Sequence, residues 1–261
     1  MHVKSNVRFV GCLAAVAALL IAGPAMANTT STWSAGADGQ WGVGGNWSTS
    51  PTVPDNNGAD YDVFIDSSAA NVTVQIGDAA GNPGDYEVSN VTIDAGDELF
   101  IRDFSFLTID TDTGGTVTVN GTLTVEHSGP GGEFGTLDRV GSGTLLFTGS
   151  GVIKGTKDNG NVTFGSDVTR NIIDTDITVT GGMQLKGSFT NRGTLTDTAR
   201  VLDLQPNAIQ NEGLLEASAN NGPLQLIKGT VTNDTSFGGG MLNVVAGGKL
   251  SVGGGGNVGV I

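Results

Sequence analysis

Short runs of alternating apolar and polar residues cover the chain from about Tyr61 onward. In these runs Val, Ile, Leu or Phe alternates with Thr, Ser or Asp, and Gly, Asn or Asp bounds each run. The alternation has the period of a half-buried β-strand, and the bounding residues favour turns. No stretch has the i, i+3, i+4, i+7 apolar spacing of an amphipathic helix. The pattern therefore predicts an all-β protein, with strands at 62–65, 72–76, 88–93, 99–101, 106–109, 116–119, 122–125, 144–147 and 161–164.

A recurring phrase sets the predicted architecture. Phe-Thr-Asn-Arg-Gly-Thr-Leu at 189–195 resembles Ile-Gln-Asn-Glu-Gly-Leu-Leu at 209–215, and Val-Thr-Asn at 231–233 begins the phrase again. Asn191, Asn211 and Asn233 therefore recur at nearly equal intervals, and the Gly-x-Leu elements that end at Leu123 and Leu145 are separated by a similar interval. A short, regular period of this kind is typical of a solenoid, in which each repeat stacks on the previous one.

We therefore expect a single-stranded parallel β-helix (β-solenoid) with about 20–24 residues per rung. Asn191, Asn211 and Asn233 would stack as a ladder at equivalent corners, and the corner Gly or Asn residues would supply turns with positive φ. A β-sandwich is the alternative all-β architecture, but it does not require one phrase to return at the spacing of a rung.

Residues 1–27 have the pattern of a secretory signal peptide. Lys4 and Arg8 precede an apolar stretch at 9–22, Gly-Pro follows at 23–24, and Ala-Met-Ala at 25–27 fits a cleavage site. We expect three segments: a signal peptide (1–27), a Trp-rich N-terminal cap (28–60) and β-solenoid rungs (61–261). The last residues are strand-like and lack a polar cap, so we expect either a truncated C-terminus or an end that pairs with another molecule.

Composition excludes several kinds of chemistry. Cys12, the only cysteine, lies in the signal segment, so the mature chain would have no disulfide, no thiol nucleophile and no thiolate metal site. Removal of Lys4 and Arg8 from 12 cationic residues leaves 10 against 26 acidic residues, a formal charge of −16. Such a charge repels nucleic acid and anionic lipid, so we expect no nucleic-acid partner and no membrane insertion of the mature chain.

Histidine is equally scarce. His127 would be the only histidine left in the mature chain, which excludes a His-based metal cluster. Gly-Pro-Gly-Gly follows it closely at 129–132, so we expect His127 on an exposed loop.

The segment before the first predicted rung carries a family resemblance. Thr32-Trp33, Gly39-Gln40-Trp41, Gly45-Asn46-Trp47, Pro54 and the Asp-Val-Phe-Ile-Asp run at 62–66 form a "TW…GxW…NW…P…DxVxI" phrase. This phrase resembles the start of secreted bacterial autotransporter-like and PEP-CTERM-type β-solenoid proteins, and the later Asn-x-Gly phrases resemble haemagglutinin-like rungs. The resemblance implies a secreted, extracellular or cell-surface protein of a Gram-negative-type bacterial envelope. Its implied partners are extracellular matrix, surface glycans or further copies of itself.

Two kinds of binding site are candidates. Trp33, Trp41 and Trp47 could form a platform on which sugar rings stack, or a hydrophobic plug over the first rung; their place before that rung favours the plug. Asp55, Asp60, Asp62, Asp110 and Asp112 offer oxygen ligands for calcium. Neither cluster has the spacing of an EF-hand loop, and Asp in turns usually bonds to its own backbone, so we expect no cofactor.

Catalysis has weak support in the sequence. Arg102 with Asp103, and Asp174 with Asp176 near Arg170, could be imagined as catalytic groups, but no lyase-type signature accompanies them. The sequence therefore predicts a non-catalytic structural or adhesin-like protein. The alternative is an extracellular β-helix protein that binds or degrades polysaccharide.

Overall fold

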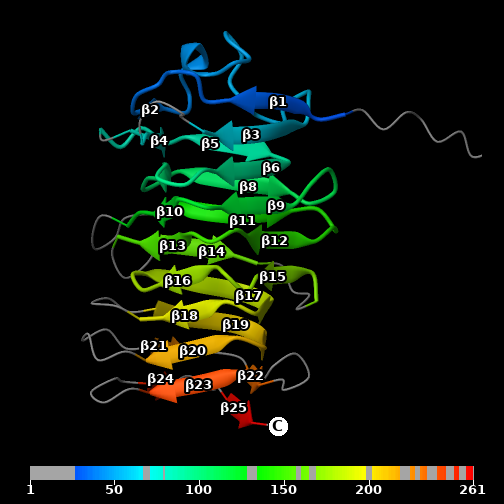
Figure 1. The fold of residues 1–261 in the computed structure, drawn as a ribbon, viewed down its shortest axis with the longest axis vertical. Coiled ribbons are helices and arrows are strands. Elements are labelled where there is room, and N and C mark those ends of the chain that lie inside the picture. The colour runs from blue at the N-terminus through cyan, green and yellow to red at the C-terminus, as the bar shows by residue number, and fades with distance from the viewer. Residues whose placement is uncertain are drawn as a thin grey trace, which may run out of the picture.

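The computed structural model describes residues 27–66, 71–78, 80–127, 134–156, 160–164, 169–197, 202–217, 224–226, 230–233, 240–244, 250–252 and 257–260 (Figure 1). The predicted signal peptide lies outside the described residues apart from Ala27, and so does Cys12. Among the described residues the only helix is the 3₁₀ turn η1 (Gly44–Asn46). The prediction of an all-β chain is confirmed.

The strands lie in three rows, and the chain visits the rows in turn. Row 1 holds β1 (Thr29–Thr32), β3 (Tyr61–Ile65), β6 (Asn90–Ile93), β9 (Thr116–Val119), β12 (Leu145–Thr148), β15 (Asn171–Ile173), β22 (Thr230–Asn233) and β25 (Asn257–Val260). Row 2 holds β2 (Gly39–Gln40), β4 (Thr73–Ile76), β7 (Glu98–Ile101), β10 (Thr122–Val125), β13 (Val152–Gly155), β16 (Thr178–Thr180), β18 (Thr194–Thr196), β20 (Leu214–Ala217) and β23 (Met241–Val244). Row 3 holds β5 (Asp85–Val88), β8 (Phe106–Asp110), β11 (Thr136–Val140), β14 (Gly160–Thr163), β21 (Leu224–Leu226) and β24 (Leu250–Val252).

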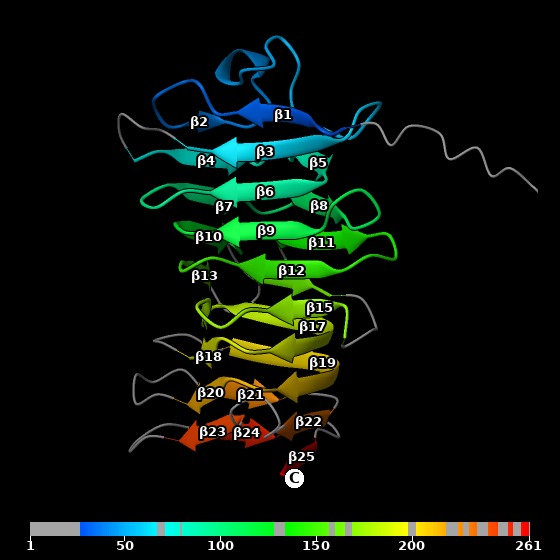
Figure 2. The same cartoon turned by 45° about the vertical axis from the view of Figure 1, so that its right-hand side comes forward.

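Two long strands join row 3 to row 1. β17 (Met183–Asn191) and β19 (Leu202–Asn211) each begin in row 3 and end in row 1. Rows 1 and 3 therefore belong to one 16-stranded sheet, and row 2 is a 9-stranded sheet. Every strand pair in both sheets is parallel, for example β3 with β6 and β7 with β10. Figures 1 and 2 show the strands stacked along the long axis of the molecule.

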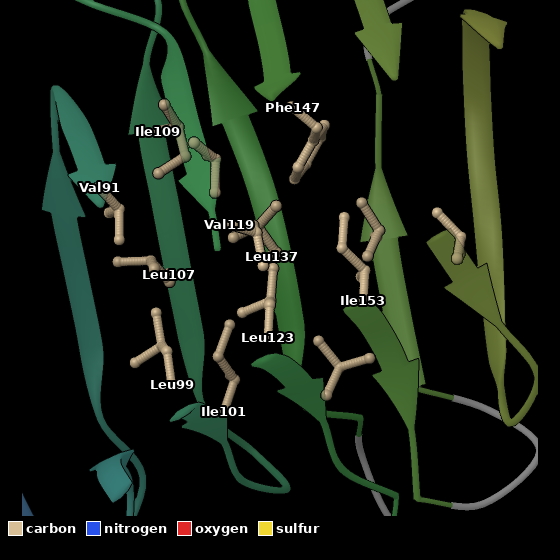
Figure 3. Close-up of a cluster of buried hydrophobic side chains, with 14 of the residues drawn as sticks. Val91, Leu99, Ile101, Leu107, Ile109, Val119, Leu123, Leu137, Phe147 and Ile153 are labelled. Carbon is tan, nitrogen blue, oxygen red and sulfur yellow. The ribbon is translucent and has the colours of Figure 1, made fainter. Parts of the chain in front are cut away.

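The core lies between the rows and follows from the alternation of residues along each strand. In row 1, Val63, Val91 and Val117 are register partners on successive strands, and all three are buried. Figure 3 shows apolar side chains from neighbouring strands converging in the interior. Burial of each such side chain contributes about 1.5–3 kcal/mol, and the stacked rows make these contributions continuous along the molecule.

The interval between register partners on successive turns varies more than predicted. Asn191 pairs with Asn211, and Asn211 pairs with Asn233, so the predicted interval holds in that part of row 1. The interval is clearly longer from Val117 to Phe147 and shorter from Ile173 to Asn191. The predicted 20–24 residues per rung therefore hold for only part of the chain, because the connections between strands differ in length while the strands stay in register.

The prediction that the Gly-x-Leu elements ending at Leu123 and Leu145 occupy equivalent positions in successive rungs is wrong. Leu123 lies in row 2, where it pairs with Leu99 and Ile153, whereas Leu145 lies in row 1 and pairs with Asn171. The two Gly-x-Leu elements occupy different corners, so the interval between them is not the length of a turn of the chain.

A column of glycines lines the corner between rows 1 and 2, for a reason other than the expected one. Gly149, at this corner, has the expected positive φ of 107°, but Gly193 and Gly213 do not. Instead, a Cβ atom on Gly213 would collide with the carbonyl oxygen of Gly193, and one on Gly193 with that of Ile177. The same close approach to a neighbouring backbone occurs at Gly121, Gly151 and Gly240. These positions need glycine because the backbones of adjacent turns touch there.

Candidate functional sites at the N-terminal end

The three tryptophans form a buried cluster above the first turn. Trp33, Trp41 and Trp47 are 2%, 0% and 1% exposed. The rings of Trp33 and Trp47 pack edge to face with centroids 5.0 Å apart, and those of Trp41 and Trp47 are 4.8 Å apart. The indole N–H groups donate to backbone carbonyls, namely Trp33 to Ala37 (3.1 Å), Trp41 to Pro54 (3.1 Å) and Trp47 to Trp41 (2.7 Å).

This burial decides what the cluster can do. A sugar-stacking platform needs exposed ring faces, and here all three indoles are covered and their polar atoms are bonded within the chain. The hypothesis of glycan binding at these residues is therefore not supported. Trp41 instead packs on Tyr86 of β5, with ring centroids 5.8 Å apart, so the cluster is attached to the first turn from above.

The aspartates considered as calcium ligands accept local hydrogen bonds within the chain. The Asp62 carboxylate accepts from the amides of Asn28 (2.8 Å) and Asn90 (2.7 Å). Asp110 accepts from the backbone of Asp112 (2.9 Å) and the hydroxyl of Thr113 (3.0 Å). Each side chain therefore stabilises a turn or ties neighbouring turns together.

Two further calcium-ligand candidates, Asp112 and Asp55, also accept hydrogen bonds within the chain. Asp112 accepts from the backbone of Ser142 (2.7 Å) in the next turn, and Asp55 accepts from the backbone of Glu87 (3.1 Å). Over the described part of the chain, no three Asp, Glu, His or Cys side chains converge into a group that could hold a metal ion. The calcium hypothesis is therefore not supported at these residues.

A polar groove lies beside the cluster, and sequence reasoning missed it. It has a volume of about 370 Å³ and is lined by Asp55, Asn56, Asn57, Asp85, Tyr86, Glu87 and Thr108. A second hollow of about 360 Å³ shares Asp55, Asn57 and Tyr86 with it. The groove forms where the 52–59 segment passes over the start of row 3, which the sequence pattern of a turn does not reveal.

Carboxylates dominate the electrostatics of this groove. Burial, and then the charges of surrounding carboxylates, raise the pKa of Glu87 above its ordinary value; these carboxylates belong to Asp110, Asp55, Asp60 and Asp85. Burial also raises the pKa of Tyr86, with a smaller contribution from Asp55. Like charges gathered at one place make the groove a region of negative potential.

The raised pKa of Glu87 predicts a pH-dependent effect of Glu87→Gln. In the folded chain Glu87 holds its proton above the ordinary pKa of 4.5, so the free energy of unfolding falls as pH rises through and above that value. Relative to the parent, Glu87→Gln should therefore gain stability between about pH 4 and about pH 7. Urea unfolding at both pH values measures this gain. Asp66→Asn, at an exposed position after β3, is the control, and an equal gain in both variants would contradict the assignment.

The predicted asparagine ladder is present between two turns. Asn191 and Asn211 are 0% exposed, and the Asn191 amide donates to the Asn211 side-chain oxygen at 2.8 Å. The Asn211 amide donates onward to the carbonyl of Met241 at 3.3 Å. Asn233 is the register partner of Asn211, but its side chain lies outside the described part.

We predict that Asn211→Ala destabilises the chain by about 1–3 kcal/mol, because it leaves buried partners without their bonds. Thermal unfolding followed by circular dichroism measures the loss. Asn243→Ala removes an amide that bonds Glu216 at 2.9 Å on a less buried site, so it should cost less. Equal losses would contradict a special role for the buried ladder.

The surroundings of His127, Arg102 and Asp103 differ from those that the sequence suggested. His127 is 7% exposed and packs on Phe134 with ring centroids 4.9 Å apart, so the prediction of an exposed loop position is wrong. Arg102 bonds Gln75 (2.9 Å) and Glu126 (3.4 Å) on the outer surface, whereas Asp103 is buried. Arg102 and Asp103 therefore lie in different environments.

The Asp174 carboxylate bonds locally as well. It accepts from the backbone of Thr175 at 2.9 Å and lies 3.5 Å from the hydroxyl of Thr148. In the described ranges no helix has the length and apolar character needed to cross a membrane. Comparison of the chain with protein-family models, with curated proteins and with solved structures found no match.

Proposed function

We propose that this chain is a single-stranded parallel β-helix, closed at its start by a Trp-rich cap at residues 28–60, and that it acts as a non-catalytic structural or adhesin-like protein. The observation that carries the proposal is the continuous parallel pairing of row 1 from β1 to β25, and of row 2 from β2 to β23. A stack of this kind is quasi-one-dimensional and holds its outer faces at fixed spacing.

The outward residues support a role in surface display. Thr116 and Thr118 on row 1 alternate with the buried Val117, and Thr194 and Thr196 on row 2 alternate with the buried Leu195. Polar side chains therefore cover much of the outside of the stack. We propose a secreted or cell-surface location in a Gram-negative-type envelope, with extracellular matrix, surface glycans or further copies of the chain as partners. The resemblance of residues 32–66 to secreted β-solenoid proteins supports this location.

The test combines binding with turnover. Residues 28–261 would be screened on a glycan array and assayed for turnover of anionic polysaccharides. Binding without turnover is the expected result. Turnover would contradict a non-catalytic role, and the absence of any binding to glycans or matrix proteins would contradict an adhesive one.

The alternative is a β-helix protein that binds or degrades polysaccharide, and the groove at Glu87 favours it. A carboxyl group with a raised pKa, close to other carboxylates in a hollow, has the protonation behaviour of a general acid. If this alternative holds, Glu87→Gln should abolish turnover and Asp66→Asn should leave it unchanged. Equal activity of the two variants would contradict a catalytic role for Glu87.

A further inference from the structure

At the N-terminal end of the stack, side chains of the cap form hydrogen bonds with the outward backbone groups of the edge strands. A strand at the edge of a sheet normally presents free N–H and C=O groups, which can pair with a strand of another molecule. In parallel pairing, alternate residues of an edge strand direct both groups away from the sheet. The partners of the outward N–H and C=O groups at this end therefore show which residues take the place of a further strand.

In row 1 the last residue of the edge strand β1, Thr32, is covered by Ser48. The backbone N–H of Thr32 donates to the Ser48 hydroxyl at 2.9 Å, and the carbonyl of Thr32 accepts from the backbone of Ser48 at 2.8 Å. Beyond this point Trp33 and Trp47 form an isolated antiparallel bridge. A turn segment that runs in the opposite direction therefore occupies the edge of β1.

In row 2 the edge is covered in two places. The Asn46 amide donates to the outward carbonyl of Gln40 in β2 at 3.1 Å. β2 is only two residues long and does not reach the start of β4, where the N–H of Thr73 donates to the Asp38 carboxylate at 2.7 Å. Asp38 thus supplies the acceptor that a longer strand would have provided.

In row 3 no strand lies above β5 among the residues that the structure describes. The N–H of Glu87 donates to the Asp55 carboxylate at 3.1 Å, and its carbonyl accepts from the backbone of Asn56 at 2.6 Å. Figure 1 shows the segment before β3 lying over the first turn, where these contacts are made. Asp55, a candidate calcium ligand by sequence, therefore accepts a hydrogen bond from the edge strand of row 3.

We propose that Ser48, Asn46, Asp38 and Asp55 close this end of the stack, and that opening it exposes a self-association surface that fits a second copy of this chain. Each side chain bonds an edge group that a further strand would use. Two of the four also place a negative charge at the edge, and a second copy would bring the same charges into contact. The inference goes beyond the proposed function, because it assigns to the first turn a latent interface that the folded chain keeps blocked.

The test removes the carboxylates while keeping the sequence otherwise intact. In Asp38→Ala with Asp55→Ala, the N–H groups of Thr73 and Glu87 lose their acceptors, and we expect the mass measured by light scattering to rise at least twofold over the parent. Asp38→Asn with Asp55→Asn removes the same charges but retains an oxygen acceptor at each site, so it should associate less than the alanine pair. Asp112→Ala with Asp174→Ala removes two carboxylates at other corners of the stack and should keep the parent mass.

The location of the new contact is tested with single thiols in a Cys12→Ser background. Val43→Cys lies in the cap and Val140→Cys on β11, at positions that are 49% and 45% exposed. With both aspartates replaced by alanine, disulfide-linked dimers should form faster at Val43→Cys than at Val140→Cys. Equal rates would overturn the proposal.

Two further results would overturn it. One is an alanine pair that keeps the parent mass and melting temperature, and the other is association of the asparagine pair to the same extent as the alanine pair. If the alanine pair loses its β-sheet circular dichroism, Asn46→Ala with Ser48→Ala opens the edges of rows 2 and 1 instead. A folded protein of parent mass in that variant would also count against the proposal.

Discussion

Replacement of Trp41 by alanine should detach the cap and lower the free energy of unfolding by about 3–5 kcal/mol, the usual cost of removing a large buried aromatic side chain. Trp41 is fully buried, and its ring packs on both Trp47 and Tyr86. Its indole N–H also bonds the carbonyl of Pro54, and its backbone N–H bonds that of Gln75 in β4. The substitution therefore removes the packing on Tyr86 and Trp47 and the indole bond to Pro54, while the backbone bond to Gln75 remains.

The position of the tryptophans allows unfolding of the cap to be measured separately from unfolding of the whole stack. All three lie between residues 33 and 47, so intrinsic fluorescence reports on the cap, whereas far-ultraviolet circular dichroism reports on the whole stack. In Trp41→Ala the fluorescence transition in urea should shift to lower concentration and precede the dichroism transition. Phe64→Ala, an aromatic replacement at a 37% exposed site on β3, should shift both transitions little. A single transition unchanged from the parent would contradict the role of Trp41.

Gly213→Ala should destabilise the stack by about 1–3 kcal/mol or more, as expected when a side chain is forced into a filled space. A Cβ at this position would collide with the backbone carbonyls of Gly193 and Arg192, which cannot rotate away as a side chain can. Relief of the collision requires the corner between β19 and β20 to move away from the turn before it. The bond from the Leu214 N–H to the carbonyl of Gly193, at 2.9 Å, would lengthen as a result.

Gly45→Ala is the matched control for this prediction. Gly45 has no other atom within 4 Å of the added Cβ and does not have a positive φ. Its replacement should be neutral or stabilise by about 0.4–1 kcal/mol, because alanine restricts the unfolded chain. Urea unfolding followed by circular dichroism compares the two variants. A loss of similar size in both would show that the glycine column is not set by the close approach of backbones.

The sequence could predict the strands because their alternation is a local property. The runs at 62–65, 99–101 and 116–119 coincide with β3, β7 and β9 to within one residue at each end. The register of Asn191 with Asn211 was also predictable, because both lie in one repeated phrase. The length of each turn was not, since it depends on connections whose residues carry no periodic signal. Leu123 and Leu145 show the limit, as similar phrases serve different corners.

The candidate site was less accessible to sequence reasoning. The position of Trp41 before the first strand favoured a plug, but its burial depends on contacts with Pro54 and Tyr86, which are distant from it in the sequence. Asp55 carried the signal of a metal ligand because an aspartate in a turn and an aspartate on a strand edge look alike in sequence. The groove around Glu87 needs row 3 and the 52–59 segment in place before it exists.

The glycine column also determines where this protein can accept inserted sequence. At the corners with Gly121, Gly193 and Gly213, only two residues connect row 1 to row 2, and the backbones of adjacent turns are in contact. Between rows 2 and 3 the connection is much shorter after β7 than after β10, yet β8 and β11 remain in register. Added loops can therefore enter between rows 2 and 3 without disturbing the strands, while the glycine corner fixes the alignment of the stack. Foreign peptides grafted after β7 and after β10 would be displayed along one edge of the molecule, one strand spacing apart.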